Sequence, residues 1–351
     1  MRRATRVRVG FAALLLAGAC LMQPFALRAQ ERADDTQTPV GPPVEAQGVV
    51  RDSLRATEAA IDTLAAGRSY ARIGGLACDA FGRVWLSDGT GHRIARLDDA
   101  GRLIDQAGAL GSDAGQFRRP GALAVAGALG VAVLDIENRR VSLYDHHLRL
   151  LGAAVDLAAT ALEDRVGRVT PVGLAADRGG ALYVADAERD RVLVFDFAGT
   201  FQHELGGFGA RSGGFSGLAG VAAAGRGMLV TLERPRARPR KSATADSLVG
   251  RSRVQWLDAA GRVVRAAWTP VWSAGAGETA LAIAADDAGR VAVVAERSGE
   301  WCLLGADGQL LAQRGGLAAP TALAFTLDGR VLLAESGAAR IVRLDTRATG
   351  E

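Results

Sequence analysis

Gly82-Arg-Val-Trp-Leu-Ser-Asp88, followed by Arg93 five positions after the acidic residue, is a pattern that recurs along this chain. It combines a glycine, alternating apolar residues, an acidic residue and an arginine. Further copies of the acidic residue and its arginine occur at Asp135 and Arg140, Asp186 and Arg191, and Glu335 and Arg340. A recurring supersecondary unit determines the architecture before any single residue is interpreted.

Each copy lies in a longer unit of short apolar strands separated by Gly or Asp turns, which is typical of an all-β fold. In the first unit we expect strands at 76–79, 83–87, 93–97 and 102–107. Four further units are expected at 122–156, 172–205, 218–268 and 280–313, and a sixth has only three strands, from Ala322 to near Asp345. Six four-stranded antiparallel units in a ring form a β-propeller. The sequence therefore predicts a six-bladed β-propeller over 73–347.

The segment 49–72 precedes the first unit and is ambiguous between a short helix and a strand. The sixth unit lacks one strand, and a strand from this segment would supply it and close the ring. Closure removes the free sheet edges that an open array exposes. Segment 30–48 is polar, contains Pro39, Pro42 and Pro43, and is expected to be a flexible linker.

The first 29 residues have the features of a secretory signal peptide. Five of the 42 basic residues lie there with no acidic residue, so the rest of the chain carries 37 basic against 38 acidic residues. An apolar stretch follows the arginines, and Leu27-Arg28-Ala29 is an acceptable cleavage site before Gln30. We expect a periplasmic or secreted protein. The near-neutral remainder does not favour nucleic acid, which requires clustered positive charge.

Cysteines are few. Cys20 stands in a segment that resembles a bacterial lipoprotein signal, although Ala17 occupies the usual leucine position; simple cleavage is favoured and a lipid anchor at Cys20 is the alternative. Cys78 and Cys302 fall in different units and at different strand positions. They are expected to be buried, unpaired thiols.

The acidic residue and its arginine are expected to be structural. The acidic residue ends the second strand of a unit and the arginine opens the third, so the carboxylate can accept loop N–H groups and a charge-assisted bond from the guanidinium. Glu233 with Arg253 is the corresponding pair of the fourth unit, where a long insertion separates the two. A metal-binding ring of these acids is disfavoured, because metal ligands must converge on one point.

These motifs resemble those of NHL-repeat propellers, a family with the TolB-like propeller architecture. The segment Gly111-Ser-Asp-Ala-Gly-Gln-Phe117-Arg-Arg-Pro120 is close to the glycine-rich sequence between blades of that family. The resemblance covers about 73–345 and implies the fold. Units four and five depart from it. Related six-bladed propellers include gluconolactonase-type hydrolases and streptogramin lyase, in which metal ligands or a catalytic His lie at the channel mouth.

Residues suited to such chemistry do not converge in this sequence. The four histidines fall in a loop (His92), a turn on the expected opposite face (His146 and His147) and an outer strand (His203). The acids of the innermost strands, Asp79, Asp177 and Asp286, each precede a glycine turn and are expected to form that turn. We expect no metal and no cofactor.

The remaining candidates are loops on one face, formed by the strand-two to strand-three loops and the blade-to-blade connections. The longest insertions, 157–171, 234–250 and 270–278, all map there. The insertion 234–250 concentrates positive charge, which could attract an acidic partner, although a solvated loop is the simpler interpretation. The candidate binding residues are Phe117, Arg118, Arg119, Arg234, Arg236, Arg238, Arg240, Lys241 and Trp272.

The expected function is non-catalytic binding of a protein, peptide or cell-envelope glycan through this face, by a monomer without a transmembrane span. The alternative is a metal-dependent lactonase-like or lyase-like propeller enzyme with unusual ligands.

Overall fold

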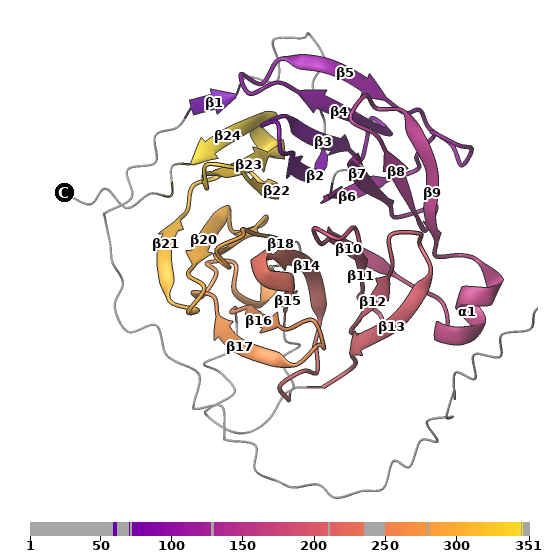
Figure 1. The fold of residues 1–351 in the computed structure, drawn as a ribbon. Helices are drawn as coiled ribbons and strands as arrows, with labels where there is room; N and C mark the ends of the chain where they lie inside the picture. Colours follow the sequence, from indigo (N-terminus) through magenta and orange to yellow (C-terminus); the bar gives the residue numbers. More distant parts are fainter. Residues whose placement is uncertain are drawn as a thin grey trace, which may run out of the picture. The chain divides into compact units, whose positions relative to one another are not determined.

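Six antiparallel four-stranded sheets are arranged in a ring, as Figure 1 shows. This computed structural model describes residues 59–61, 70, 72–127, 130–209, 211–234, 250–278, 281–344 and 346. The six-bladed β-propeller predicted from the repeat is thereby confirmed. The expected signal peptide at 1–29, Cys20, the linker at 30–48 and most of the segment 49–72 lie outside the described residues.

The first three blades follow one another along the chain, each from its innermost to its outermost strand. Blade 1 consists of β2 (Ile73–Cys78), β3 (Val84–Asp88), β4 (Arg93–Leu97) and β5 (Leu103–Ala107). Blade 2 consists of β6 (Pro120–Ala126), β7 (Gly130–Asp135), β8 (Arg140–Tyr144) and β9 (Leu150–Asp156). Blade 3 consists of β10 (Pro171–Ala176), β11 (Leu182–Asp186), β12 (Arg191–Phe195) and β13 (Phe201–Gly206).

The next two blades repeat this order, with 3-10 turns added. Blade 4 consists of β14 (Leu218–Ala224), β15 (Met228–Glu233), β16 (Arg253–Leu257) and β17 (Val263–Trp268), and η2 (Gly225–Gly227) joins its first two strands. Blade 5 consists of β18 (Leu281–Ala285), β19 (Val291–Ala295), β20 (Glu300–Leu304) and β21 (Leu310–Arg314), after the turn η4 (Gly275–Gly277).

Blade 6 combines the end of the chain with a strand from its beginning. Its strands are β22 (Pro320–Phe325), β23 (Val331–Glu335), β24 (Arg340–Leu344) and β1 (Ala59–Ile61), with η5 (Ser336–Ala338) before β24. The short β1 pairs antiparallel with β24, with Ala59 opposite Arg343 and Ile61 opposite Ile341. Closure of the ring by an N-terminal strand stays a prediction, because the segments on both sides of β1 lie outside the described residues.

The connection from β9 to β10 contains a helix that the sequence did not predict. Helix α1 (Thr160–Val166) buries Leu162 and Val166 in the cluster between blades 2 and 3. This connection is the expected insertion 157–171, and Figure 1 shows the helix at the edge of the ring. A seven-residue helix has too short an apolar period to be recognised in sequence, and packing stabilises it.

The hydrophobic core lies between the blades. The described residues form six buried clusters, and each combines residues of two neighbouring blades. The cluster between blades 1 and 2, for example, packs Trp85 and Ile94 against Val131 and Val133. Each blade therefore depends on both of its neighbours, as in other repeat architectures.

Five innermost strands carry a β-bulge near their start, whereas β18 pairs with β19 without a register shift. The register of β2 with β3 shifts between Ile73 and Gly75, and equivalent shifts occur at the start of β6, β10, β14 and β22. A bulge leaves one residue unpaired and turns its side chain in a new direction. The residues within these shifts are Gly74, Gly121 and Ala122, Val172, Ala219, and Thr321.

We expect Gly75→Ala to destabilise the propeller, because the inner strands of blades 1 and 2 touch at Gly75. A methyl group there would lie 2.5 Å from the Gly121 carbonyl oxygen and 2.9 Å from the Leu123 nitrogen, both backbone atoms. Urea unfolding should show a loss of about 1–3 kcal/mol, as for other overpacked sites. The control is Gly315→Ala, whose methyl would lie 3.5 Å from Glu300 Cγ. Equal stability of the two variants would contradict this packing.

Candidate functional site

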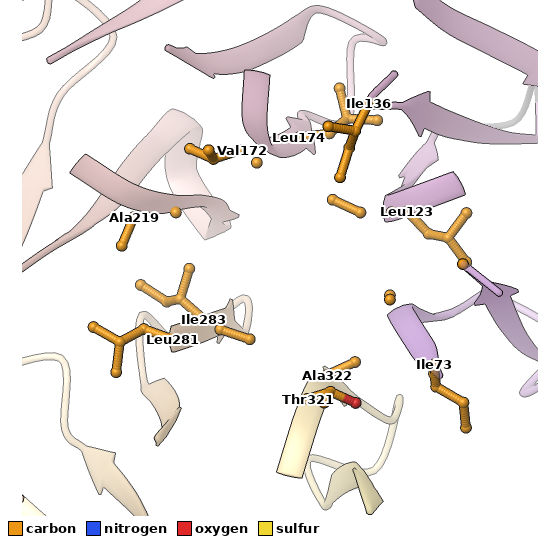
Figure 2. Close-up of a pocket in the computed structure, with 18 of the residues that line it drawn as sticks. Ile73, Leu123, Ile136, Val172, Leu174, Ala219, Leu281, Ile283, Thr321 and Ala322 are labelled. Carbon is orange, nitrogen blue, oxygen red and sulfur yellow. The ribbon is translucent and has the colours of Figure 1, made fainter. Parts of the chain in front are cut away.

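A cavity of about 570 Å³ lies at the centre of the ring. Its walls are the first halves of all six innermost strands, and its rim includes the loops that follow β3, β7, β11, β15 and β19. It therefore opens on the face of the strand-two to strand-three loops. Figure 2 shows labelled side chains from different blades around this central space.

The side chains that form the wall are apolar. Ile136, Val172, Ala219, Leu281 and Ile283 line the cavity, and none of these five side chains is fully buried. Val172 is 37% exposed, which is the highest value among these five. Apolar surface left in contact with water at the centre of a pocket is available for burial against a ligand.

Two of these side chains are held by glycines of a neighbouring strand. A methyl group on Gly121 would lie 2.6 Å from Ile136 Cδ1, and one on Gly220 would lie 2.9 Å from Ile283 Cγ2. Each isoleucine thus occupies the space that a side chain on the glycine would need. The wall is consequently preformed, with little room for rearrangement.

Four ionisable side chains line the cavity among the described residues: Arg72, Arg119, Arg234 and Glu296. Arg72 donates two hydrogen bonds to Glu296, of 3.2 Å from Nη1 and 3.3 Å from Nη2. Arg119 Nε lies 3.7 Å from Glu137 Oε1, and both side chains are half exposed. Arg234 Nη1 donates to the Glu278 carbonyl oxygen at 2.9 Å. The rim therefore carries an excess of positive charge.

One position of the repeat, immediately after the end of the second strand, supplies residues of the rim in most blades. Five of the six equivalent residues line the cavity: Gly89, Ile136, Ala187, Arg234 and Glu296. The sixth, Ser336, shares a 2.8 Å hydrogen bond with Thr321 Oγ1. Sequence reasoning named only Arg234 of these. The sequence contained one signal for this position. The residue that follows the recurrent acid changes from copy to copy, whereas the acid itself repeats.

Two expected binding residues are in the core, which corrects the prediction for them. Phe117 is fully buried and packs against Tyr144, with ring centroids 6.0 Å apart. Trp272 is 2% exposed and its Nε1 donates to Ser252 Oγ at 3.0 Å. Both side chains anchor blade-to-blade connections to the core, because large aromatic residues bury extensive apolar surface. They are not available to a ligand.

The expected basic residues fall into three groups. Arg119 and Arg234 line the cavity, whereas Arg118 is exposed and lies outside its lining. Arg236, Arg238, Arg240 and Lys241 belong to 235–249, which lies outside the described residues. The structure thus brings two of the expected arginines to the cavity.

The recurrent acid and arginine stand directly opposite each other at the end of the second strand and the start of the third. The acids are 0–1% exposed, and each lies within ion-pair distance of its arginine. These pairs are Asp88 with Arg93, Asp135 with Arg140, Asp186 with Arg191, Glu233 with Arg253, and Glu335 with Arg340. In blade 1 the Asp88 carboxylate also accepts N–H bonds from Thr90 and Gly91 of its own loop.

In four other blades the carboxylate binds the connection that arrives from the preceding blade. The donors are Arg119 N to Asp135 (3.1 Å), Thr170 N to Asp186 (3.0 Å), Ser216 N to Glu233 (2.8 Å) and Ala318 N to Glu335 (2.8 Å). Burial raises the pKa of Glu233 above its usual value, although bonds from Arg253 and Gln255 oppose the rise. These carboxylates hold the connections in place at the rim.

Blade 5 has Ala295 at the acidic position, and a glutamate from the connection replaces the missing carboxylate. Glu278 is 2% exposed and accepts N–H bonds from Arg297 (3.1 Å) and Ser298 (2.9 Å) in the strand-two to strand-three loop. Here the connection supplies the carboxylate and the strand-two to strand-three loop supplies the N–H groups, which is the reverse of the other four blades. The same two segments are joined. This exchange explains how the fifth blade keeps its geometry without the acid and arginine of the repeat.

The acids at the ends of the inner strands form turns on the opposite face. Asp79 accepts bonds from Phe81 N (2.9 Å), Arg83 N (3.1 Å) and Trp85 Nε1 (2.9 Å). Asp177 and Asp286 each accept a bond from the main chain four residues on. Among the described residues, no group of three or more His, Cys, Asp or Glu side chains is placed to hold a metal ion. All four histidines lie outside the cavity lining.

The two described cysteines are not bonded to each other. Cys302 is buried in blade 5, and Cys78 is half-buried at the end of β2. Burial raises the pKa of the Cys78 thiol to about 11, and the neighbouring Asp79 charge adds to the shift. Both thiols therefore stay protonated at neutral pH.

None of the helices in the described residues has the length and apolar character that a bilayer crossing requires.

Comparison with known proteins identifies the fold. No family model and no curated protein matches the sequence. A solved streptogramin B lyase is 14% identical, with a TM-score of 0.51 over 78% of this chain and 93% of that one. A gluconolactonase from Xanthomonas campestris is 15% identical, with a TM-score of 0.51 over 84% and 94%. The WD40 β-propeller domain of Doa1 is 10% identical, with a TM-score of 0.51 over 78% and 79%. At these identities the likeness shows a β-propeller and leaves the function open.

We expect Asp79→Asn to lower the free energy of unfolding at neutral pH by about 1.5–3 kcal/mol, the usual range for hydrogen bonds to a charged group. Burial alone would raise the pKa of Asp79, but hydrogen bonds from Trp85, Phe81 and Arg83 hold it below its usual value of 3.8. The stabilisation that ionised Asp79 gives the folded state is therefore fully present above pH 3.8. It is lost as the pH falls through the lower pKa that Asp79 has in the folded state.

Urea unfolding followed by tryptophan fluorescence, at pH 7 and at several values below about 4, measures this effect. The difference between Asp79→Asn and the natural protein should shrink as the pH falls. Asp99→Asn, at an exposed position, is the control and should change stability by less than about 0.5 kcal/mol. A loss that is the same at every pH would contradict an ionised Asp79 in the folded state.

We expect Glu278→Ala to loosen blade 5 locally. The Arg297 and Ser298 amides lose their acceptor, so their hydrogen exchange should accelerate, and stability should fall by about 1–3 kcal/mol. Exchange measured by mass spectrometry or NMR tests this. The control is Glu188→Ala, because Glu188 is exposed in the equivalent loop of blade 3 and accepts a bond only from Thr170 Oγ1 among the described residues. Unchanged exchange at Arg297 and Ser298 would show that Glu278 does not hold the loop.

Proposed function

We propose that this protein is a non-catalytic binding propeller that holds a protein or peptide partner on the face of the strand-two to strand-three loops. The observation that carries the proposal is the apolar cavity at the centre of that face. Its volume of about 570 Å³ falls within the usual range of ligand pockets. Binding sites typically combine such an apolar centre with a polar rim.

The composition of the cavity favours a peptide over a glycan. The side chains of its wall are Ile, Val, Leu and Ala, with Thr90 and Thr321 as the described hydroxyl groups of the lining. A sugar presents several hydroxyl groups, each of which needs a hydrogen-bond partner when it leaves water. An aliphatic or aromatic side chain of a protein needs none.

The cavity offers little to the alternative, a lactonase-like or lyase-like enzyme. Metal and general acid–base sites require several convergent carboxylate, His or Cys groups. Glu296 is the one carboxylate among the described lining residues, and Arg72 binds both of its oxygens. The likeness to lyase and lactonase structures supports the fold and does not favour their chemistry.

The proposal extends to where the protein acts. The NHL-like repeat, the signal-peptide pattern at 1–29 and the near-neutral charge of the remaining chain support a partner in the periplasm or outside the cell, met by a monomer. Lipidation at Cys20 is the alternative to cleavage before Gln30. Fractionation of cells that produce the full chain, with mass determination of the mature N-terminus, distinguishes these two forms.

Site-specific photocrosslinking tests the binding face. We expect a benzoylphenylalanine at Thr90, which is exposed and lines the cavity, to crosslink a partner protein in a cell-envelope extract. The matched control is the same group at Ala100, in the exposed β4–β5 turn at the opposite end of blade 1. Partner capture from Ala100 but not from Thr90 would contradict the proposed face. A stoichiometric metal ion with an activity abolished by Glu296→Gln would establish an enzyme instead.

A further inference from the structure

We infer that the partner segment that enters the cavity is acidic and inserts a single aliphatic or aromatic side chain between carboxylates. This inference rests on the proposed function and specifies its ligand. Two independent properties of the site carry it: the preformed apolar wall and the positively charged rim.

The wall offers apolar contacts to a group inserted at the axis. Side chains of blades 2, 3, 4 and 5 surround the cavity: Ile136, Val172, Ala219, Leu281 and Ile283. Because Ile136 and Ile283 are seated on Gly121 and Gly220, the wall does not collapse inward to fill the space. An inserted apolar side chain would meet apolar atoms on several sides, which is how buried hot-spot residues act at interfaces.

The rim selects for negative charge. The charge of Arg72 is balanced by Glu296 through a two-bond ion pair. Arg119 shares a long, exposed contact with Glu137, and such contacts contribute little. Arg234 binds a neutral carbonyl oxygen, and none of the described carboxylates forms an ion pair with it. Arg119 and Arg234 can therefore take carboxylates of the partner, for which the planar guanidinium is well suited.

The charge excess also opposes a basic partner. A lysine or arginine beside the inserted side chain would be brought toward two guanidinium groups of like charge, which disfavours it. Uncharged peptides would gain the apolar contact but not the rim contacts. The sequence pattern we infer is thus one apolar residue flanked by Asp or Glu.

A random dodecapeptide library displayed on phage tests this pattern, because it contains acidic, basic and uncharged sequences alike. The library is selected on the purified protein without counter-selection, and the enriched peptides are then tested on Val172→Asp, which places a charge on the cavity wall. Val172 is already 37% exposed at a bulge, so this substitution should leave the fold intact; circular dichroism and thermal unfolding verify that. We expect enriched peptides with an aliphatic or aromatic residue next to Asp or Glu.

Matched variants then separate the cavity from the rest of the face. Fluorescence anisotropy with one enriched, labelled peptide should show at least tenfold weaker binding to Val172→Asp and to Arg119→Glu. The controls are Leu110→Asp and Arg118→Glu, because both positions are exposed in the connection before β6 and lie outside the cavity lining. Binding to the natural protein should weaken as salt is raised, and this salt dependence should be smaller for Arg119→Glu.

The outcomes distinguish the inference from the proposed function. Enriched peptides that bind Val172→Asp as well as the natural protein, or that are basic, would overturn the inference while peptide binding by the propeller stood. If no peptide enriches, the proposal that a peptide segment occupies the cavity is wrong. Isothermal titration with decanoate forms a second arm: saturable binding that Val172→Asp abolishes, without any enriched peptide, would assign the cavity to a small apolar acid instead.

Discussion

The buried tie between a carboxylate and a blade-to-blade connection is the constraint on which this propeller depends. In four blades the acid at the end of the second strand binds the N–H of the arriving connection and the arginine opposite, and in blade 5 Glu278 makes the tie in reverse. A buried carboxylate without partners would be strongly destabilising. Burial raises the pKa of Glu233 above its usual value even with Arg253 beside it, because desolvation disfavours the charged form. In these four blades the buried acid keeps its partners only while the connection and the third strand stay together, so the tie favours the geometry of the blade.

That tie also positions the cavity. The residue after the acid cannot face the blade interior, because the acid before it is held there and the chain turns. Ile136 and Arg234 consequently reach the rim from different blades, and Glu296 lies at the same position of blade 5, where Ala295 replaces the acid. The bulges at the start of five inner strands shape the wall of the same space, since they take residues such as Val172 and Thr321 out of the regular pairing. The scaffold repeats within the chain from copy to copy, and the side chains that it directs to the axis differ.

This division determines what could be predicted from the sequence. The blades were predictable because Gly turns, alternating strands and the acid–arginine step recur with the period of the fold, and each copy supports the others. The cavity was not, because it is assembled from one or two residues of every blade and no stretch of sequence contains it. Phe117 and Trp272 were misjudged for a related reason. Aromatic residues in a predicted surface loop suggest a binding face, but here each fills space beneath its connection, where burial of a large ring stabilises the fold. Helix α1 depends on packing between blades 2 and 3, which no local pattern reveals.

The same division explains why propellers with a common scaffold do different work. A lyase, a gluconolactonase and a WD40 domain share this fold with the chain at low identity. In this chain the residues at the axis differ from blade to blade, and together they determine the character of the central cavity. Here the inward-facing positions are filled with aliphatic side chains, and the single carboxylate of the described lining is neutralised by Arg72. Polar chemistry at this axis would require replacement of several aliphatic residues in different blades at once. Recognition of an apolar group by its shape, with orientation set by Arg119 and Arg234, requires only the residues already present.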